Sequence, residues 1–104
     1  MFLVQRIYQV KPGKARQAAT ILDKIGKAYE EGGTRSASTV YFNSGTTPGD
    51  KDTVVMQWTD ESIESAYRED RVRVDISDVV AGLSDISLGS RIEFWELVTE
   101  EKYG

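Results

Sequence analysis

The stretch Arg6-Ile7-Tyr8-Gln9-Val10-Lys11-Pro12-Gly13-Lys14 decides the fold, because a strand turns here through a corner into a long helix. Residues 2–10 are rich in aliphatic and aromatic side chains and have the length of a strand. Pro12 lacks the N–H that a sheet ladder needs, and Gly13 permits a tight turn. The sequence therefore predicts that the strand ends at Lys11-Pro12-Gly13 and that a helix follows at once.

From residue 14 to residue 31 the apolar residues follow the three-and-four spacing of a helix. Charged and amide side chains fill the side opposite a buried stripe formed by Ala15, Ala18, Leu22, Ile25 and Tyr29. Gly32-Gly33 is a natural end for this helix. About 18 residues of helix and about 8 of strand each span roughly 26 Å, so the two elements can lie side by side.

The middle of the chain predicts a hairpin followed by a second helix. Residues 36–43 and 53–58 have strand composition, and the Gly- and Pro-containing loop 44–50 joins them. Thr59 or Asp60 would cap the helix that follows, with Glu61 near its positive end.

The apolar stripe of this second helix is interrupted. It begins with Ile63, Ala66 and Tyr67, fails at Asp70, and starts again over Ile76, Val79, Val80 and Leu83. Two helical pieces that separate near residues 71–75 are predicted, although residues 71–76 also alternate as a strand would. Gly82, Ser84 and Gly89 then indicate a loosened chain before a last strand at 91–98 and a polar tail at 99–104.

The predicted order is βαββαβ, an α+β fold in a single domain that spans residues 1–104. Short right-handed crossovers place both helices on one face of a four-stranded antiparallel sheet. The other face should then be polar, yet both sides of the strands carry large apolar groups. In the first strand, Tyr8 and Val10 share a side with Arg6, whereas Leu3 and Ile7 lie on the opposite side. We therefore expect a second copy to cover the free face, giving a sheet-to-sheet homodimer.

The amino-acid composition excludes several kinds of catalytic and metal site. The chain has no cysteine and no histidine, which excludes disulfides, Ser-His-Asp triads and His- or Cys-ligated metals. A net charge of −4 opposes nucleic-acid binding, which normally needs a basic face. No apolar run approaches the ~20 residues of a membrane span, and no signal peptide is evident. A cytoplasmic protein with no metal and no cofactor is predicted.

Two corners of the chain resemble the dimeric α/β-barrel superfamily. These are Val10-Lys11-Pro12-Gly13-Lys14 after the first strand, and Trp58 at the end of the third strand. The form Arg6-x-Tyr8-x-x-Lys11-Pro12-Gly13-Lys14 is most similar to NIPSNAP-like members, and the broader layout also fits antibiotic-biosynthesis-monooxygenase-like members. The resemblance implies a ferredoxin-like monomer, a homodimer, and a cavity between sheet and helices. It does not imply one activity, because oxygenases, isomerases and haem-processing enzymes share this fold.

Six residues are the candidate ligand-binding residues, and each also has a structural interpretation. Trp58 and Trp95 would line a cavity or pack in the core or a dimer interface. Cofactor-free oxygenases of the superfamily use Asn, Trp, Tyr and Arg, residue types that Asn43, Trp58, Tyr41 and Arg6 supply here. Arg6 and Tyr8 share one side of the first strand and would bind a carboxylate or an enolate-like oxygen. The structural interpretation of Arg6 is an ion pair with Glu93 or Glu96.

Three functions from different classes remain open at this point. The first is a homodimer that holds a small apolar or aromatic ligand in a cavity between sheet and helices. The alternative is a cofactor-independent oxygenase or isomerase that acts on an aromatic or enolisable substrate. The third is an amino-acid-binding regulatory module that resembles the ACT fold, which has the same element order. A polar cluster of Arg6, Tyr8, Asn43 or Tyr41 converging on one point would favour the enzyme.

Overall fold

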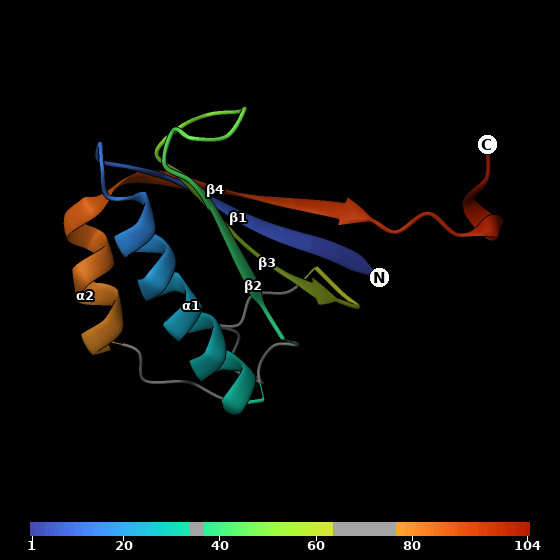
Figure 1. Cartoon of the computed structure of the whole chain (residues 1–104). Helices are drawn as coiled ribbons and strands as arrows, with labels where there is room; N and C mark the ends of the chain where they lie inside the picture. The colour runs from blue at the N-terminus through green and yellow to red at the C-terminus, as the bar shows by residue number, and fades with distance from the viewer. Residues whose placement is uncertain (34–36, 64–76) are drawn as a thin grey trace.

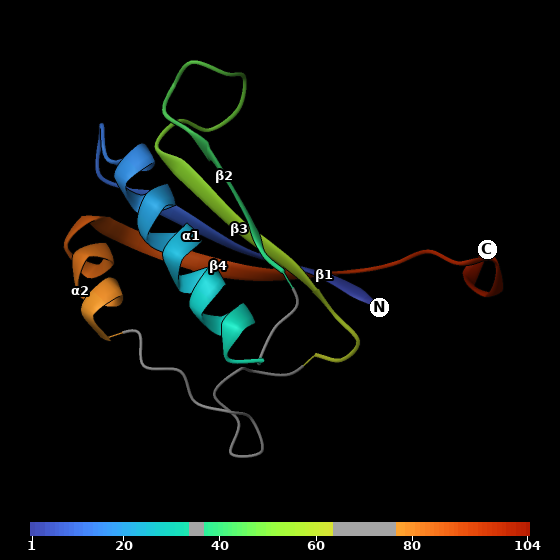
Figure 2. The same ribbon diagram turned by 60° about the horizontal axis from the view of Figure 1, so that its bottom comes forward.

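The computed structural model of the chain describes residues 1–33, 37–63 and 77–104. Along the chain lie β1 (Phe2–Val10), α1 (Ala15–Glu31), β2 (Thr39–Asn43), β3 (Thr53–Asp60), α2 (Ser77–Ile86) and β4 (Ser87–Glu96), followed by the short 3-10 helix η1 (Glu100–Lys102). The four strands form one antiparallel sheet in the order β2-β3-β1-β4. Figures 1 and 2 show α1 and α2 together on one side of this sheet. The predicted α+β class, antiparallel sheet and single helical layer are confirmed, and the architecture is compatible with a ferredoxin-like fold.

The strand register divides the sheet into two faces. Val4 pairs with Trp58 on β3 and with Phe94 on β4, and all three pack with the helices. We call this side the covered face. Ile7 pairs with Val55 and Arg91 on the opposite side, which we call the open face because no described helix lies against it.

The core lies between α1 and the covered face. Leu22 and Tyr29 on α1 are almost completely buried, as are Val4, Val54 and Met56 on the strands. Gly26 brings α1 closest to the sheet, because a Cβ there would overlap Ser38 Oγ and approach Met56 Cε to 2.9 Å. The stripe predicted from the three-and-four spacing is therefore the buried side of α1.

Hydrogen bonds from two distant segments hold the Lys11-Pro12-Gly13 corner. The backbone N–H of Val10 donates to the Asp52 carbonyl at 3.0 Å, and that of Lys11 donates to the Ile86 carbonyl at 2.9 Å. Gly13 has a φ of 78°, and its N–H donates to Asp52 Oδ1 at 3.1 Å. A residue with a Cβ rarely adopts this φ, so glycine suits the corner. The corner is structural, as the sequence indicates.

Two predicted boundaries are wrong. Thr59 and Asp60 do not cap a helix but extend β3, because they pair with Leu3 and Phe2 across the sheet. The last strand begins at Ser87 rather than residue 91, because its first residue pairs with Val10 beyond a β-bulge.

Gly82 and Ser84 lie inside α2 rather than in a loosened chain. A Cβ on Gly82 would approach Ile21 Cδ1 to 3.3 Å, so the small residue permits α2 to pack closely on α1. The helical piece predicted over Ala66 and Tyr67, the break at 71–75 and the residues around Ile76 lie outside the described residues. The same is true of the start of the predicted second strand at residue 36.

Candidate functional site

The open face carries a row of side-chain hydrogen bonds across three strands. Trp95 on β4 donates from its indole Nε1 to Gln5 Oε1 on β1 at 3.0 Å. Gln5 in turn donates from Nε2 to Gln57 Oε1 on β3 at 3.2 Å. The indole ring nevertheless remains 54% exposed. The polar groups of this row are thus paired within one subunit, while a large aromatic surface stays uncovered.

A hollow of about 330 Å³ opens on the same face, at the end near the β2–β3 loop. Ile7, Tyr41 and Val55 form its sheet floor, together with Arg91 of β4. Loop residues 47–50 form its rim. Tyr41 is 57% exposed, whereas Ile7 is buried although no helix covers it. The floor therefore offers an aromatic ring and aliphatic side chains at the surface of the sheet.

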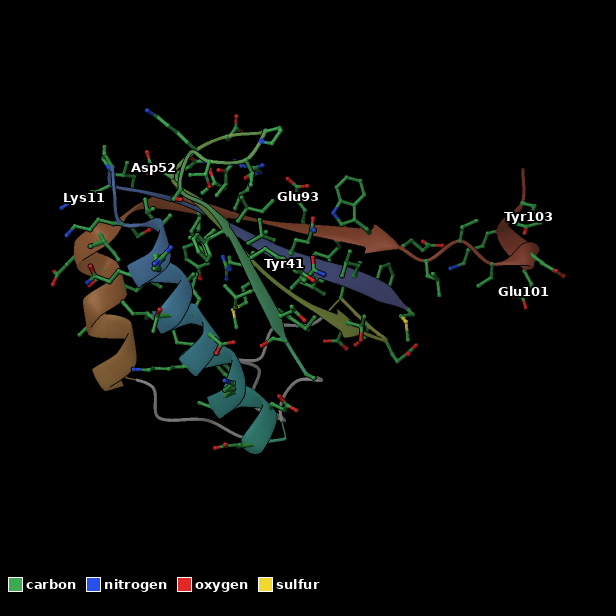
Figure 3. The ribbon with its side chains drawn as sticks, viewed as in Figure 1. Lys11, Tyr41, Asp52, Glu93, Glu101 and Tyr103 are labelled. Carbon is green, nitrogen blue, oxygen red and sulfur yellow. The ribbon has the colours of Figure 1, made fainter. Side chains whose placement is uncertain are left out.

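Charge in the hollow is compensated within the chain. The Arg91 Nε donates to Glu93 Oε2 at 2.8 Å, so the guanidinium already faces a carboxylate. Figure 3 labels Glu93 and Tyr41, which come from the two outer strands β4 and β2. A guanidinium with a neighbouring carboxylate attracts an anion weakly. The hollow therefore combines an aromatic ring and aliphatic side chains with the paired Arg91 guanidinium and the Asp50 carboxylate.

Asn43 lies at the rim, but its amide holds the loop. Its Nδ2 donates to the Thr47 carbonyl at 3.0 Å and to the Pro48 carbonyl at 3.4 Å. Its Oδ1 accepts from the Gly45 N–H at 2.8 Å. An amide has two N–H groups and one oxygen, so little capacity is left for a ligand. Asn43 shapes the hollow through the loop.

The other predicted residues lie on the covered face. Arg6 pairs in register with Met56 and Ile92, and Tyr8 packs against the core two residues further along the strand. The prediction that Arg6 and Tyr8 share one side of β1 is confirmed. Trp58 is buried and belongs to the core cluster.

The predicted ion pair between Arg6 and Glu93 or Glu96 is wrong. Glu93 lies on the open face, where Arg91 is its partner. Glu96 accepts from Lys102 Nζ at 2.8 Å. A hydrogen bond from Lys102 and its positive charge lower the pKa of the Glu96 carboxyl below its usual range.

The six predicted site residues do not meet at one point. Tyr41 and Asn43 adjoin the hollow on the open face, and Trp95 lies on the same face but within the Gln5–Gln57 row. Arg6, Tyr8 and Trp58 belong to the opposite face. The sheet separates Arg6 and Tyr8 from Tyr41 and Asn43, so these four side chains do not all converge on one point. A cavity between sheet and helices stays a prediction, because residues 64–76 are not described.

Sequence reasoning missed Ile7, Val55 and Arg91 as parts of a hollow. The signal was present for Ile7, whose position opposite Arg6 and Tyr8 already placed it on the free side of β1. The register that brings Arg91 and Val55 beside it joins segments about 84 and 48 residues away in the chain. No local pattern specifies such a register.

Within the described part of the chain, no group of three or more carboxylates is arranged to hold a metal ion. The described helices are all too short or too polar to cross a membrane. No protein-family model matches the chain, and no curated protein sequence matches it either.

Proposed function

We propose that this protein is a homodimer that packs through its open sheet faces and binds a small aromatic or apolar ligand in the hollow beside Tyr41. The observation that supports it is the apolar surface on the open face: Trp95 is 54% and Tyr41 57% exposed on a sheet side without a helical layer. Monomeric soluble proteins rarely leave large contiguous apolar patches in water. The resemblance to dimeric α/β barrels points to the same arrangement.

Charge supports self-association on this face in particular. The whole chain has a net charge of −4, so two copies repel one another in general. On the open side of the paired strands the charged residues are Arg91 and Glu93, which form an ion pair. The remaining polar residues there are amides and threonines, which carry no charge. Two open faces can therefore approach without a like-charge penalty.

The hollow and the dimer are linked in this proposal. The hollow is bounded by the sheet and by loop residues 47–50 but is open toward the side where the second copy would pack. A ligand on Tyr41 would then be enclosed between the two subunits. A ligand that binds the dimer better than the monomer must strengthen dimerisation by the same factor.

The first test is the mass of the particle in solution. Light scattering and sedimentation velocity across a concentration series should give twice the chain mass of 11.6 kDa at the upper concentrations. Trp95→Glu should weaken dimerisation by about tenfold or more, because it brings two like charges into the interface. Leu88→Glu is the matched control, since Leu88 is also exposed on β4 but lies at its beginning. A particle of 11.6 kDa throughout would refute the dimer.

The second test is ligand binding. Native mass spectrometry of the purified protein should reveal a co-purifying small molecule, and 1-naphthol serves as a fluorescent aromatic probe. Tyr41→Ala should weaken 1-naphthol binding by about five- to tenfold, because it removes the exposed ring of the hollow. Ile63→Ala removes an exposed large apolar side chain outside the hollow and should leave the affinity unchanged. Equal losses in both variants, or no binding at all, would contradict this site.

A further inference from the structure

The segment after β4 leaves the body of the domain. Its last backbone hydrogen bond to another strand runs from the Leu97 N–H to the Met1 carbonyl at 3.0 Å. Beyond that point residues 97–104 extend past the end of the sheet, and Figures 1 and 2 both show the C-terminus standing away from the rest of the chain. We call residues 97–104 the C-terminal arm.

The arm has a defined shape. Lys102 donates from Nζ to the Leu97 carbonyl at 2.9 Å and pairs with the Glu96 carboxylate at 2.8 Å. Backbone bonds from Lys102 to Thr99 and from Tyr103 to Glu100 close the η1 turn. Lys102 therefore holds the η1 turn against the end of β4. A segment that is ordered in advance loses less entropy when it binds.

The arm exposes three large apolar side chains beside its charged ones. Val98 is 66%, Leu97 50% and Tyr103 73% exposed. Figure 3 shows Tyr103 and Glu101 at the outer end of the arm, apart from the side chains of the domain. Among the described residues, four exposed large hydrophobic side chains gather at the end of β4 and in the arm: Trp95, Leu97, Val98 and Tyr103. Such a cluster marks a surface that another chain covers.

The arm continues the open face. Side chains alternate along a strand, so Leu97 projects to the same side as Trp95. A second copy that packs on the open face would therefore also lie against the arm. We propose, building on the homodimer proposed above, that the C-terminal arm of each subunit packs on the second copy and clasps the dimer.

Sedimentation velocity on the full-length chain tests this clasp. The double variant L97D/Y103D should weaken dimerisation by about tenfold or more, because two apolar contacts are replaced by charges. Thr99→Asp is the matched control. It adds a charge to the same arm at the position that precedes η1, where Asp is a favourable cap, and should change the dissociation constant less than about twofold. Circular dichroism melts should confirm that both variants keep the fold.

A cross-linking experiment checks where the arm lies. The chain has no cysteine, so Val98→Cys provides one attachment point for a thiol-reactive photo-cross-linker. With a mixture of ¹⁵N-labelled and unlabelled chains, heavy–light cross-linked peptides are expected. Cross-links only within one chain would overturn the clasp.

The outcomes separate the two proposals. A wild-type dimer that L97D/Y103D leaves intact refutes the clasp and leaves the sheet-to-sheet dimer standing. A wild type that remains monomeric at every concentration refutes both. A dimer weakened equally by Thr99→Asp would mean that added charge, rather than lost apolar contact, is responsible, and this too would refute the clasp.

Discussion

The two faces of the sheet are built from alternate residues of the same strands, yet they are completed in different ways. On the covered face, Val4, Val54 and Met56 pack against α1 and are almost completely buried. On the open face, Gln5, Gln57 and Trp95 join in a hydrogen-bonded row, and the aromatic ring beside them stays in water. The apolar side chains of the covered face are buried by the chain's own helices. The open face pairs its polar groups within the chain but leaves large apolar side chains exposed.

The largest expected effect comes from the covered face. Leu22→Ala leaves a cavity against the sheet and should lower the free energy of unfolding by about 2–5 kcal/mol. The melting temperature should fall by roughly 4–8 °C for each kcal/mol. Val55→Ala on the open face is the comparison, with an expected loss of about 1 kcal/mol in dilute solution because Val55 is only half-buried.

Protein concentration sharpens this first comparison. If a second copy covers the open face, the loss caused by Val55→Ala should grow as the concentration rises, while the loss caused by Leu22→Ala should change little. Equal losses for the two variants in dilute solution would contradict the distinction between the faces.

The next effect tests how closely α1 approaches the covered face. Gly26→Ala adds a methyl group that overlaps Ser38 Oγ and presses on Met56 Cε, so we expect a loss of about 1–3 kcal/mol despite the better helix propensity of alanine. Urea unfolding measures this loss in the free energy of unfolding. Thr20→Ala, at an exposed position on the same helix, should change stability by less than about 0.5 kcal/mol. A gain in stability at Gly26 would show that the neighbours move aside without cost.

A smaller effect is expected on the open face. Trp95→Phe keeps an aromatic ring but removes the indole N–H that donates to Gln5, so the loss should be about 1 kcal/mol or less. Gln5→Ala and the double variant complete a thermodynamic cycle. Additive losses would mean that the row of hydrogen bonds contributes nothing as a unit.

The smallest effect concerns the base of the C-terminal arm. Lys102 lowers the pKa of Glu96, so Lys102→Met should return that pKa toward its ordinary value. A carboxyl whose pKa is lowered by folding stabilises the folded state above its ordinary pKa, and this contribution is lost as the pH falls through the lowered value. NMR titration of the Glu96 side chain measures the change, with Lys51→Met as the control. An unchanged titration would mean that Lys102 does not hold the arm in solution.

The comparison of the faces also explains what the sequence could predict. Period and composition located β1, α1 and the hairpin, and the side assignment of Arg6, Tyr8 and Ile7 was correct. The strand extension through Thr59 and Asp60 was missed because turn-forming residue types were outweighed by pairing with Leu3 and Phe2 about 57 residues earlier. Gly82 was misread because its role, close contact with Ile21, exists only after two helices have packed.

The candidate site was less accessible to sequence reasoning than the fold. Tyr41 and Trp95 were selected for their chemistry, and both lie on the open face. Arg6 and Trp58 were selected on the same grounds, and both lie on the covered face. Knowing which residues of a strand share a side does not tell which of the two sides the helices cover. Both sides are apolar here, so the sequence left that choice ambiguous. Arg91 and Val55 join the hollow only through the strand register.

The corner at Lys11-Pro12-Gly13 has a consequence for how the molecule opens. Its amides at Val10 and Lys11 are bonded to Asp52 and Ile86, which belong to the hairpin and to the end of α2. Solvent hydrogen can replace these two amide protons only when segments about 42 and 75 residues away have separated from β1. The short turn that begins the fold is therefore a reporter of its global opening, slow to exchange although Pro12 and Gly13 beside it lie at the surface.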